Sequence, residues 1–200
     1  MSKLLESLRR ASDDLRAVGA RSALVGGLAV SVRTEPRTTR DADFAVAVAD
    51  DRQAEAIVGA LVRSGYRVAA GVEQVEAGRL ATMRLWPPGA SDAVAIVDLL
   101  FASSGIEPEI VDAAEPLPII EGLVERVATV GHLIALKILA RDDRRRPQDR
   151  VDIAALLRVA AHDELDRAGL ALDLIRARGF ARGRDLRRAL ADAIRDLGDP

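Results

Sequence analysis

The spacing of apolar residues in the first half of the chain changes between the period of about 3.6 that predicts a helix and the short runs that predict strands. Glycines follow several of these segments, where they favour turns and helix ends. The predicted elements are, in order, a helix at 3–18, a strand at 22–25, a helix at 28–33, a strand at 43–48, a helix at 52–64 and a strand that begins at 66. This alternation predicts an α/β lobe.

The second half has a different pattern. A strand at 80–86, inside a segment rich in glycine and proline, predicts a hairpin, and the apolar run 93–100 is compatible with another strand. Three prolines break 106–120 into short pieces. The predicted helices after this point are 129–142, 148–160, 163–178 and 183–197. We therefore predict an α/β lobe at residues 1–125, followed by a helical lobe at residues 126–200.

Composition excludes several classes of protein. At 200 residues, the chain is long enough to bury about 70% of its unfolded surface. Its apolar runs end well before the roughly 20 residues that a membrane span needs. The first residues lead directly into an amphipathic pattern and do not resemble a signal peptide. The absence of cysteine excludes disulfides and thiolate metal sites. We expect a cytoplasmic protein with no membrane partner.

The net charge is -2, so a nucleic acid would have to bind at a local basic patch. Two arginine-rich stretches are candidates, namely Arg141 with residues 144–146, and residues 176–195. Each is equally consistent with a solvated helix face. Only two of the 29 basic residues are lysines, Lys3 and Lys137. Lys137 therefore stands out in a chain that otherwise uses arginine.

Asp41 and Asp43 are the first candidates for chemistry. The strand period of two directs both side chains to one face, with Cα atoms about 7 Å apart. Such a pair can hold one divalent cation, or two cations about 3.5–4 Å apart. Hard oxygen ligands suit Mg²⁺, which binds through one or two carboxylates and substrate phosphates. An isolated pair of this kind is more often a polar edge or a helix cap, so the choice between these interpretations and a metal site depends on the surrounding residues.

Three features around this pair favour a phosphate-transfer site. Gly26 and Gly27 lie between a strand and a helix, where backbone N–H groups and the helix dipole favour a phosphate. Asp98 lies in a strand-like apolar run, where burial is costly unless the carboxylate is paired or binds a metal. Between the glycines and the acids are three arginines that could bind a triphosphate or balance the acids: Arg33, Arg37 and Arg40.

Lys137 lies in an otherwise apolar helical stretch, 133–140. It is either a lysine that extends from a core face to solvent or an ammonium that grips a triphosphate. Asp152, on the next predicted helix, would position it. Asp149 shares a helical face with Asp152 by i,i+3 spacing, but it follows Pro147 and we interpret it as a first-turn acid. The two histidines, at 132 and 162, have no spacing typical of metal ligands, and we interpret them as structural.

Together these motifs resemble those of the DNA polymerase β-like nucleotidyltransferases. The similarity is more specific to bacterial nucleotidyltransferase toxins of the MenT and AbiEii type, and it extends over about residues 20–160. The segments that carry it are Val25-Gly26-Gly27-Leu28-Ala29, Arg37-Thr38-Thr39-Arg40-Asp41-Ala42-Asp43-Phe44, Leu133-Ile134-Ala135-Leu136-Lys137-Ile138-Leu139-Ala140-Arg141 and Asp149-Arg150-Val151-Asp152-Ile153.

This resemblance implies an α+β fold with a mixed sheet, and a set of site residues. The expected catalytic residues are Asp41, Asp43, Asp98, Lys137 and Asp152. The expected nucleotide-binding residues are Gly26, Gly27, Ser31, Arg33, Arg37 and Lys137. Two Mg²⁺ ions are expected on Asp41, Asp43 and Asp98.

The same resemblance implies an activity and its control. A nucleoside triphosphate would donate its nucleoside monophosphate to the 3′ end of tRNA, which would block translation, and a cognate antitoxin would neutralise the enzyme. Thr39 matches the position at which the family is silenced by phosphorylation. The acceptor could instead be a small molecule such as an aminoglycoside, or a protein, because one fold serves all of these reactions. An alternative of another class is a noncatalytic module that binds a nucleotide or a protein.

Overall fold

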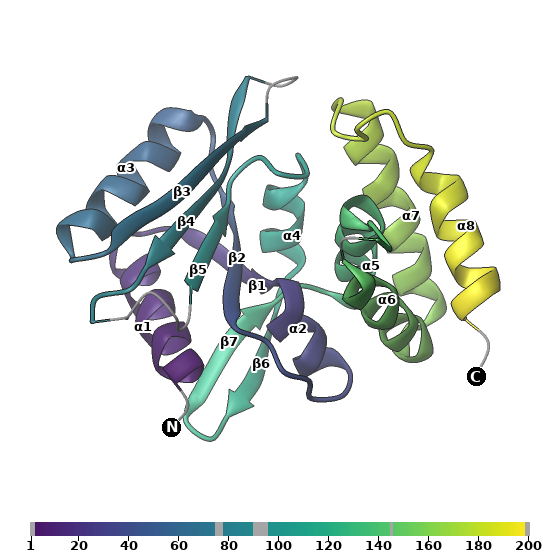
Figure 1. Cartoon of the computed structure of the whole chain (residues 1–200), viewed down its shortest axis with the longest axis horizontal. Coiled ribbons are helices and arrows are strands. Elements are labelled where there is room, and N and C mark those ends of the chain that lie inside the picture. Colours follow the sequence, from purple (N-terminus) through teal and green to yellow (C-terminus); the bar gives the residue numbers. More distant parts are fainter. Residues whose placement is uncertain (1–2, 75–77, 90–95, 145, 199–200) are drawn as a thin grey trace.

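The computed structural model describes residues 3–74, 78–89, 96–144 and 146–198. The strands are β1 (Arg21–Val25), β2 (Asp41–Ala47), β3 (Arg67–Gln74), β4 (Arg79–Trp86), β5 (Ile96–Leu100), β6 (Glu115–Ile120) and β7 (Leu123–Val127). The helices are α1 (Lys3–Ala17), α2 (Gly26–Arg33), α3 (Asp51–Arg63), α4 (Glu107–Ala113), α5 (Val130–Ala140), α6 (Pro147–Val159), α7 (His162–Ala177) and α8 (Leu186–Leu197). Figure 1 shows the strands gathered in one lobe and α5 to α8 in another.

The strands form one mixed sheet in the order β3-β4-β5-β2-β1-β7-β6. At its centre, β2 pairs parallel with β5 and antiparallel with β1. In this register Asp43 lies opposite Val25 on one side and opposite Asp98 on the other. The chain ends of β1 and β2 that carry the glycines and the first acids are thereby adjacent. The mixed sheet confirms the predicted fold class.

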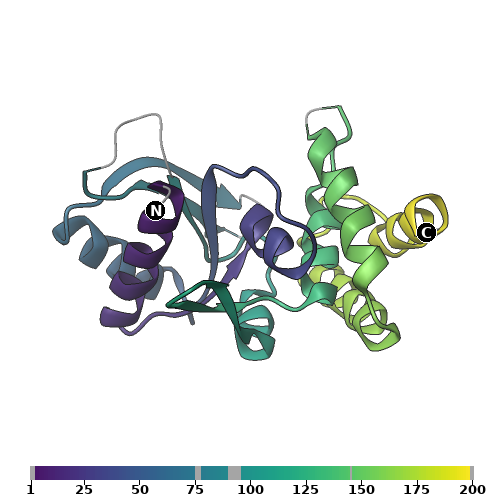
Figure 2. The ribbon, with the colours of Figure 1, turned by 90° about the horizontal axis from the view of Figure 1, so that it is seen from below.

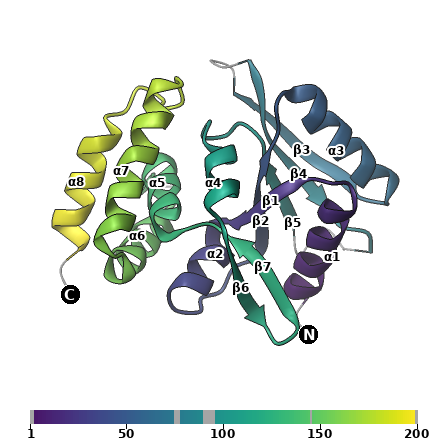
Figure 3. The ribbon, with the colours of Figure 1, turned by 180° about the vertical axis from the view of Figure 1, so that it is seen from behind.

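Helices cover the sheet on both faces. Figures 2 and 3 show α1 and α3 on the side away from the helical lobe, and α2 and α4 on the side toward it. Leu8 and Leu15 of α1 and Ile110 of α4 are at most 1% exposed. Each such side chain contributes about 1.5–3 kcal/mol by leaving water. The central strands are thus held between two apolar layers, which fixes the register of their acids.

The helical lobe is built around α5. Leu133, Ile134, Ala135 and Ile138 of this helix are all at most 1% exposed, as expected for a helix that is apolar on most sides. α5 contacts α6, α7 and α8, and both α5 and α6 contact α2 of the sheet lobe. Within the described parts of the chain, every helix is too short or too polar to span a lipid bilayer.

Most predicted elements are confirmed, including α1, α3 and all four helices of the helical lobe, within a few residues at each end. β2 begins at Asp41, two residues before the predicted start. The predicted strand at 93–100 is confirmed as β5 from residue 96, and residues 93–95 lie outside the described ranges. The division into lobes at residue 125 stays a prediction, and that position falls within β7.

The segment after β5 is more regular than the pattern predicted. We expected only short pieces at 106–120 and named no element at 121–127, but these residues form α4, β6 and β7. Pro108 lies in the first turn of α4, where the missing N–H costs nothing. Pro116 and Pro118 are two residues apart on β6, the edge strand. Proline is tolerated on an edge when its missing N–H faces away from the neighbouring strand.

Candidate active site

Three aspartates come together at the centre of the sheet. Asp41 and Asp43 are both partly buried and lie on one face of β2. Asp98, on β5, lies directly opposite Asp43 and is only 7% exposed. Because β2 and β5 are neighbours, side chains at opposed positions interact across the strands. The structure therefore brings together the three acids that the sequence singles out.

Crowding of these acids changes their pKa values. Burial, with the charges of Asp98 and Asp41, raises the pKa of Asp43 from 3.8 to about 7. Burial and the charge of Asp98 also raise the pKa of Asp41, although the charges of Arg84 and Arg40 oppose the rise. The nearby positive charges therefore only partly neutralise the ionised carboxylates of Asp41 and Asp43. A divalent cation would supply that charge.

Arg84 is bound to one member of the cluster. It lies on β4, opposite Asp98 in the strand register. Its Nε donates to Asp98 Oδ1 at 2.9 Å and its Nη2 donates to Oδ2 at 2.7 Å. These hydrogen bonds, with the charges of all three acids, raise the pKa of the guanidinium. Such a bidentate pair is the strong form of an arginine–carboxylate contact, so both oxygens of Asp98 are engaged.

The side chains present fit a cation at β2. Asp41 and Asp43 offer carboxylate oxygens on one face, and these suit a hard cation whose shell is completed by substrate phosphates. The sequence predicts Asp98 as a third ligand, but Arg84 holds its oxygens. Among the described residues, no group of three His, Cys, Asp or Glu side chains is arranged to hold a metal ion. Asp41 and Asp43 are thus open to a cation, and Asp98 as a metal ligand stays a prediction.

The glycine turn lies directly against the acids. Gly26 has a φ of +66°, which favours glycine, and a Cβ there would overlap the Asp43 carboxylate. A Cβ on Gly27 would lie 2.6 Å from Arg37 Nη2 and 3.0 Å from Thr39 Oγ1. The Gly27 N–H donates a hydrogen bond to Asp43. The N-cap residue of α2, Val25, makes no side-chain hydrogen bond, so the remaining N–H groups of the first turn suit a phosphate.

A second charged network joins α5 to α6. The Nζ of Lys137 lies 2.8 Å from Asp149 Oδ1 and 2.8 Å from Asp152 Oδ2. Arg37 reaches this network from the segment before β2, and its Nη2 lies 2.7 Å from Asp152 Oδ2. Burial acts to raise the pKa of Asp152, but the hydrogen bond and charge of Lys137, joined by Arg37, lower it overall. The two buried acids therefore each have a cationic partner.

The two networks meet where the lobes join. The charge of Lys137 opposes the rise in the pKa of Asp43, so the lysine acts electrostatically on the sheet acids. Arg37 lies against Gly27 and also contacts Asp152. Since α2 contacts both α5 and α6, the glycine turn, the β2 acids and the lysine surround one region.

Arg33 does not join this region, contrary to the prediction that it binds nucleotide. Its Nε and Nη2 donate to the carbonyls of Ala128 and Val127 at 3.0 and 3.1 Å. Its Nη1 donates to Glu115 Oε2 at 2.7 Å. The guanidinium thereby ties α2 to the end of β7 and the start of β6. Arg33 has a structural role because its donors are already bound.

Ser31 also has local partners. Its hydroxyl donates to the carbonyl of Gly27, one turn earlier in α2, at 3.1 Å. It accepts the backbone N–H of Arg37 at 3.4 Å. Ser31 therefore connects the glycine turn to the segment that carries Arg37, and its place in a nucleotide site stays a prediction.

Sequence reasoning missed the roles of Arg84 and Asp149. The strand pattern places Arg84 on β4, but only the order of strands shows that it faces Asp98. Asp149 is 4% exposed and pairs with Lys137, so it is more than the first-turn acid that we predicted. The i,i+3 spacing of Asp149 and Asp152 was the available signal, since it puts both acids on the face that meets α5.

All seven arginines of 176–195 have partners within the protein. Five of the seven form ion pairs with Asp or Glu, and the other two, Arg182 and Arg184, donate to backbone carbonyls. Arg141 forms a bidentate pair with Asp143, with both distances 2.7 Å. Arg145 lies outside the described residues. A solvated face of paired charges therefore describes 176–195 better than a phosphate-binding patch.

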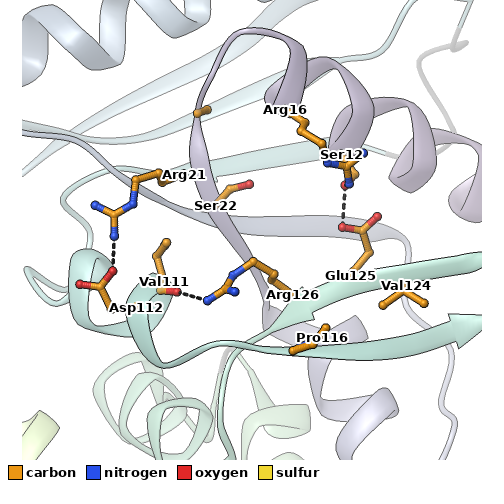
Figure 4. A pocket seen from close by; sticks show the side chains of 11 residues that line it. Ser12, Arg16, Arg21, Ser22, Val111, Asp112, Pro116, Val124, Glu125 and Arg126 are labelled. Atoms are coloured by element: carbon orange, nitrogen blue, oxygen red, sulfur yellow. Dashed lines mark hydrogen bonds and ion pairs between the residues drawn. The ribbon is translucent and has the colours of Figure 1, made fainter.

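A hollow of about 450 Å³ lies elsewhere, between α1, the start of β1, α4 and the β6–β7 hairpin (Figure 4). Ser12 donates to the buried Glu125 in its wall at 2.5 Å, and Arg21 pairs with Asp112 at its edge. It shares no residue with the carboxylate cluster. The candidate active site is therefore defined by the chemistry of its side chains and lies apart from this hollow.

Comparison with known proteins agrees with this chemistry. The sequence matches the family described as "Nucleotidyl transferase AbiEii toxin, Type IV TA system" over residues 7–198. No curated protein matches the chain closely enough in sequence to count as a relative.

Two solved structures share the fold. An antigenic nucleotidyltransferase-like protein from Paracoccidioides brasiliensis is 21% identical, with a TM-score of 0.55 over 94% of this chain and 92% of that one. The lincosamide antibiotic adenylyltransferase LnuA, solved with lincomycin bound, is 16% identical, with a TM-score of 0.50 over 78% of this chain and 97% of that one. At these identities the likeness concerns the fold, whereas the family match spans nearly the whole sequence. The chain belongs to the AbiEii nucleotidyl transferase toxin family of type IV toxin–antitoxin systems.

Proposed function

We propose that this toxin is a Mg²⁺-dependent enzyme that transfers a nucleoside monophosphate from a nucleoside triphosphate to the 3′ end of tRNA. One observation carries the chemistry: Asp41, Asp43 and Asp98 converge on two strands beside a helix N-terminus whose N-cap residue makes no side-chain hydrogen bond. Family membership supports the transferase activity and the toxin role. The resemblance of the glycine turn, the Asp-x-Asp and the lysine segment to those of the MenT toxins supports the tRNA acceptor.

Each residue has a defined part in the proposed reaction. Asp41 and Asp43 would hold Mg²⁺, which when bound neutralises phosphate charge. Gly26 and Gly27 bring bare backbone to the start of α2, where N–H groups bind phosphate oxygens. Asp98, held by Arg84, would orient the acceptor hydroxyl toward the α-phosphate.

The lysine network would serve the departing pyrophosphate. Lys137 is 15% exposed and already acts on the charge of Asp43. Asp149 and Asp152 hold its ammonium in place, and the same ammonium can donate a proton to the leaving group. Arg37, held by Asp152 over Gly27, adds a second cation for the phosphates. A charge-assisted contact of this kind is stronger than a neutral hydrogen bond.

A transfer assay tests this function. The protein is incubated with Mg²⁺ and each labelled nucleoside triphosphate, with bulk tRNA, an aminoglycoside panel and total protein as separate acceptors. We expect label on tRNA, lost in Asp41→Ala. Asp51→Ala is the matched control because Asp51 pairs with Arg79 on the sheet, outside the acid cluster. Label on a small molecule or a protein instead would identify another acceptor, and no transfer at all would favour a binding module.

Thr39 offers a means of control by a cognate antitoxin. Its hydroxyl lies close enough to Gly27 that a Cβ there would be 3.0 Å away, at the turn where a substrate phosphate is expected. A phosphate on Thr39 would add about 1.5–2 negative charges at that turn and repel the triphosphate. Mass spectrometry of the toxin expressed with its antitoxin should detect phosphothreonine at 39. An inactive toxin without the modification would exclude this mode of control.

A further inference from the structure

The bidentate pair between Arg84 and Asp98 bears on how many cations the centre takes. Two-metal transfer sites use carboxylates to hold ions about 3.5–4 Å apart. Here the two acids of β2 are open to a cation, but Asp98 accepts two hydrogen bonds from one guanidinium, at 2.9 and 2.7 Å. A cation on Asp98 would have to compete with both contacts.

The position of Arg84 is set by the fold. The row of opposed residues runs from Asp43 on β2 through Asp98 on β5 to Arg84 on β4. Its neighbour Leu85 is fully buried and Asp98 is 7% exposed, whereas the Arg84 side chain itself is 44% exposed. The guanidinium therefore lies beside Asp98 as a consequence of strand register and not through a mobile loop.

The charges of the acid cluster and Arg84 also favour a single cation. The fields of Asp41, Asp43 and Asp98 all act on Arg84. A guanidinium remains charged at any pH at which the protein is folded. The three ionised acids and Arg84 together carry two net negative charges, which one divalent ion neutralises, and the charges of Arg40 and Lys137 also act on Asp41 and Asp43.

We propose that this centre binds a single divalent cation through Asp41 and Asp43. Arg84 binds the Asp98 carboxylate and supplies the positive charge that a second ion would otherwise supply. Arg84 is thus a positioning residue for Asp98. This proposal rests on the proposed function, because the cation would serve nucleotidyl transfer. Its test is independent of that function, since cation binding is measured without nucleotide or RNA.

The test is titration of the full-length protein with Mn²⁺ alone, with the free ion followed by electron paramagnetic resonance. We expect the wild type to bind one ion. Asp43→Asn should weaken binding at least tenfold, whereas Asp98→Asn should stay within threefold of the wild type. Arg84→Ala should bind a second ion or bind at least fivefold more tightly. In the double variant Arg84→Ala/Asp98→Asn this gain should disappear, because the freed ligand is gone.

Controls separate ligand release from a general change of charge. Arg79→Ala removes an arginine from the same strand that pairs with Asp51 instead, and it should leave Mn²⁺ binding unchanged. Arg84→Lys keeps the charge but cannot engage both oxygens, so its affinity should lie between those of wild type and Arg84→Ala. Thermal unfolding in chelator shows that each variant is folded.

Three results would overturn the proposal: two ions bound by the wild type, a tenfold or greater loss in Asp98→Asn, or a gain in Arg84→Ala that persists in the double variant. Failure of the transfer assay with every acceptor, with one ion bound as expected, would instead refute the proposed function and leave the one-ion centre standing.

Discussion

The two ionic networks of this protein differ in their balance. On the sheet, Asp41, Asp43 and Asp98 have Arg84 as their closely paired cation. On the helices, Asp149 and Asp152 are shared between Lys137 and Arg37. The first network raises the pKa values of the β2 acids, and the second lowers that of Asp152. The sheet network is thus prepared to accept a cation, whereas the helical network is balanced in charge, with two acids against two cations.

This difference separates two tasks within one site. A cluster with excess negative charge is less stable than a neutral one but binds a metal ion, and such strain is common at functional sites. A balanced cluster fixes a side chain in place without attracting further ions. Substitutions in the two networks should therefore have opposite effects on stability while both reduce transfer.

Asp43→Asn should have the largest effect. Transfer should fall about 10³-fold, because the loss of a metal ligand removes several kcal/mol of charge stabilisation. In metal-free buffer the variant should also be about 1–2 kcal/mol more stable than wild type, since it relieves repulsion between buried acids. Rate assays and thermal unfolding check the two effects. Lower stability in Asp43→Asn would show that the sheet acids are not under strain.

Lys137→Met should break the helical network and lower both quantities. It leaves two buried carboxylates with Arg37 as a partner for only one of them, which should cost about 2–4 kcal/mol of stability. Transfer should fall about 10²-fold if the ammonium stabilises charge on the leaving group. Chemical unfolding and single-turnover kinetics measure the two losses.

A double variant sharpens this result. Lys137→Met/Asp149→Asn removes the acid that Lys137→Met leaves without a cationic partner, so it should recover part of the lost stability and none of the lost transfer. Recovery of both would mean that Lys137 acts only by holding the fold together. No recovery of stability would mean that Asp149 is not its partner in solution.

Gly27→Ala should have an intermediate effect because it lies between the networks. The new Cβ would come within 2.6 Å of Arg37 Nη2, and the arginine would have to move away from Asp152. We expect roughly tenfold lower kcat/KM, mainly through a higher KM for the triphosphate, and about 1 kcal/mol lower stability. Gly59→Ala, which meets only the end of Arg63 at 3.5 Å on α3, should leave kcat/KM unchanged and raise stability by about 0.5–1 kcal/mol, as expected inside a helix.

The smallest effect should be on the pH dependence of stability. The pKa of Asp152 is lower in the folded protein than its ordinary 3.8. Its contribution is therefore present above pH 3.8 and is lost as the pH falls through the lower folded value. The difference in unfolding free energy between wild type and Asp152→Asn should be constant above about pH 5 and shrink in stronger acid. A difference that grows on acidification would contradict the balanced network.

The sequence was sufficient for part of this site. Asp41 and Asp43 were found because the strand period of two is local information. The role of Lys137 was inferred from its rarity and its apolar surroundings. Arg84 could not be found in this way, because its partner is fixed by the order of strands in the sheet. The same limit applies to Arg33, whose acceptors lie more than 80 residues away in the chain.

The helices and strands that the sequence predicted differ from those it missed in the same way, because the predicted ones depend on local pattern and the missed ones on distant partners. Helices such as α1 and α7 have a periodic apolar face and were predicted. β7 was missed because its five residues follow a proline-rich segment and alternate in burial over a short length. Its strand character comes from pairing with β6 and β1, which only the assembled sheet supplies.

The prolines of β6 affect how the protein behaves at high concentration. Pro116 and Pro118 leave the outer edge of the sheet without two of the N–H groups that another chain would need in order to extend it. The opposite edge, β3, has no proline and is exposed along nearly its whole length. Unwanted association by strand addition should therefore begin at β3, and a proline or lysine placed there is the substitution that should reduce it.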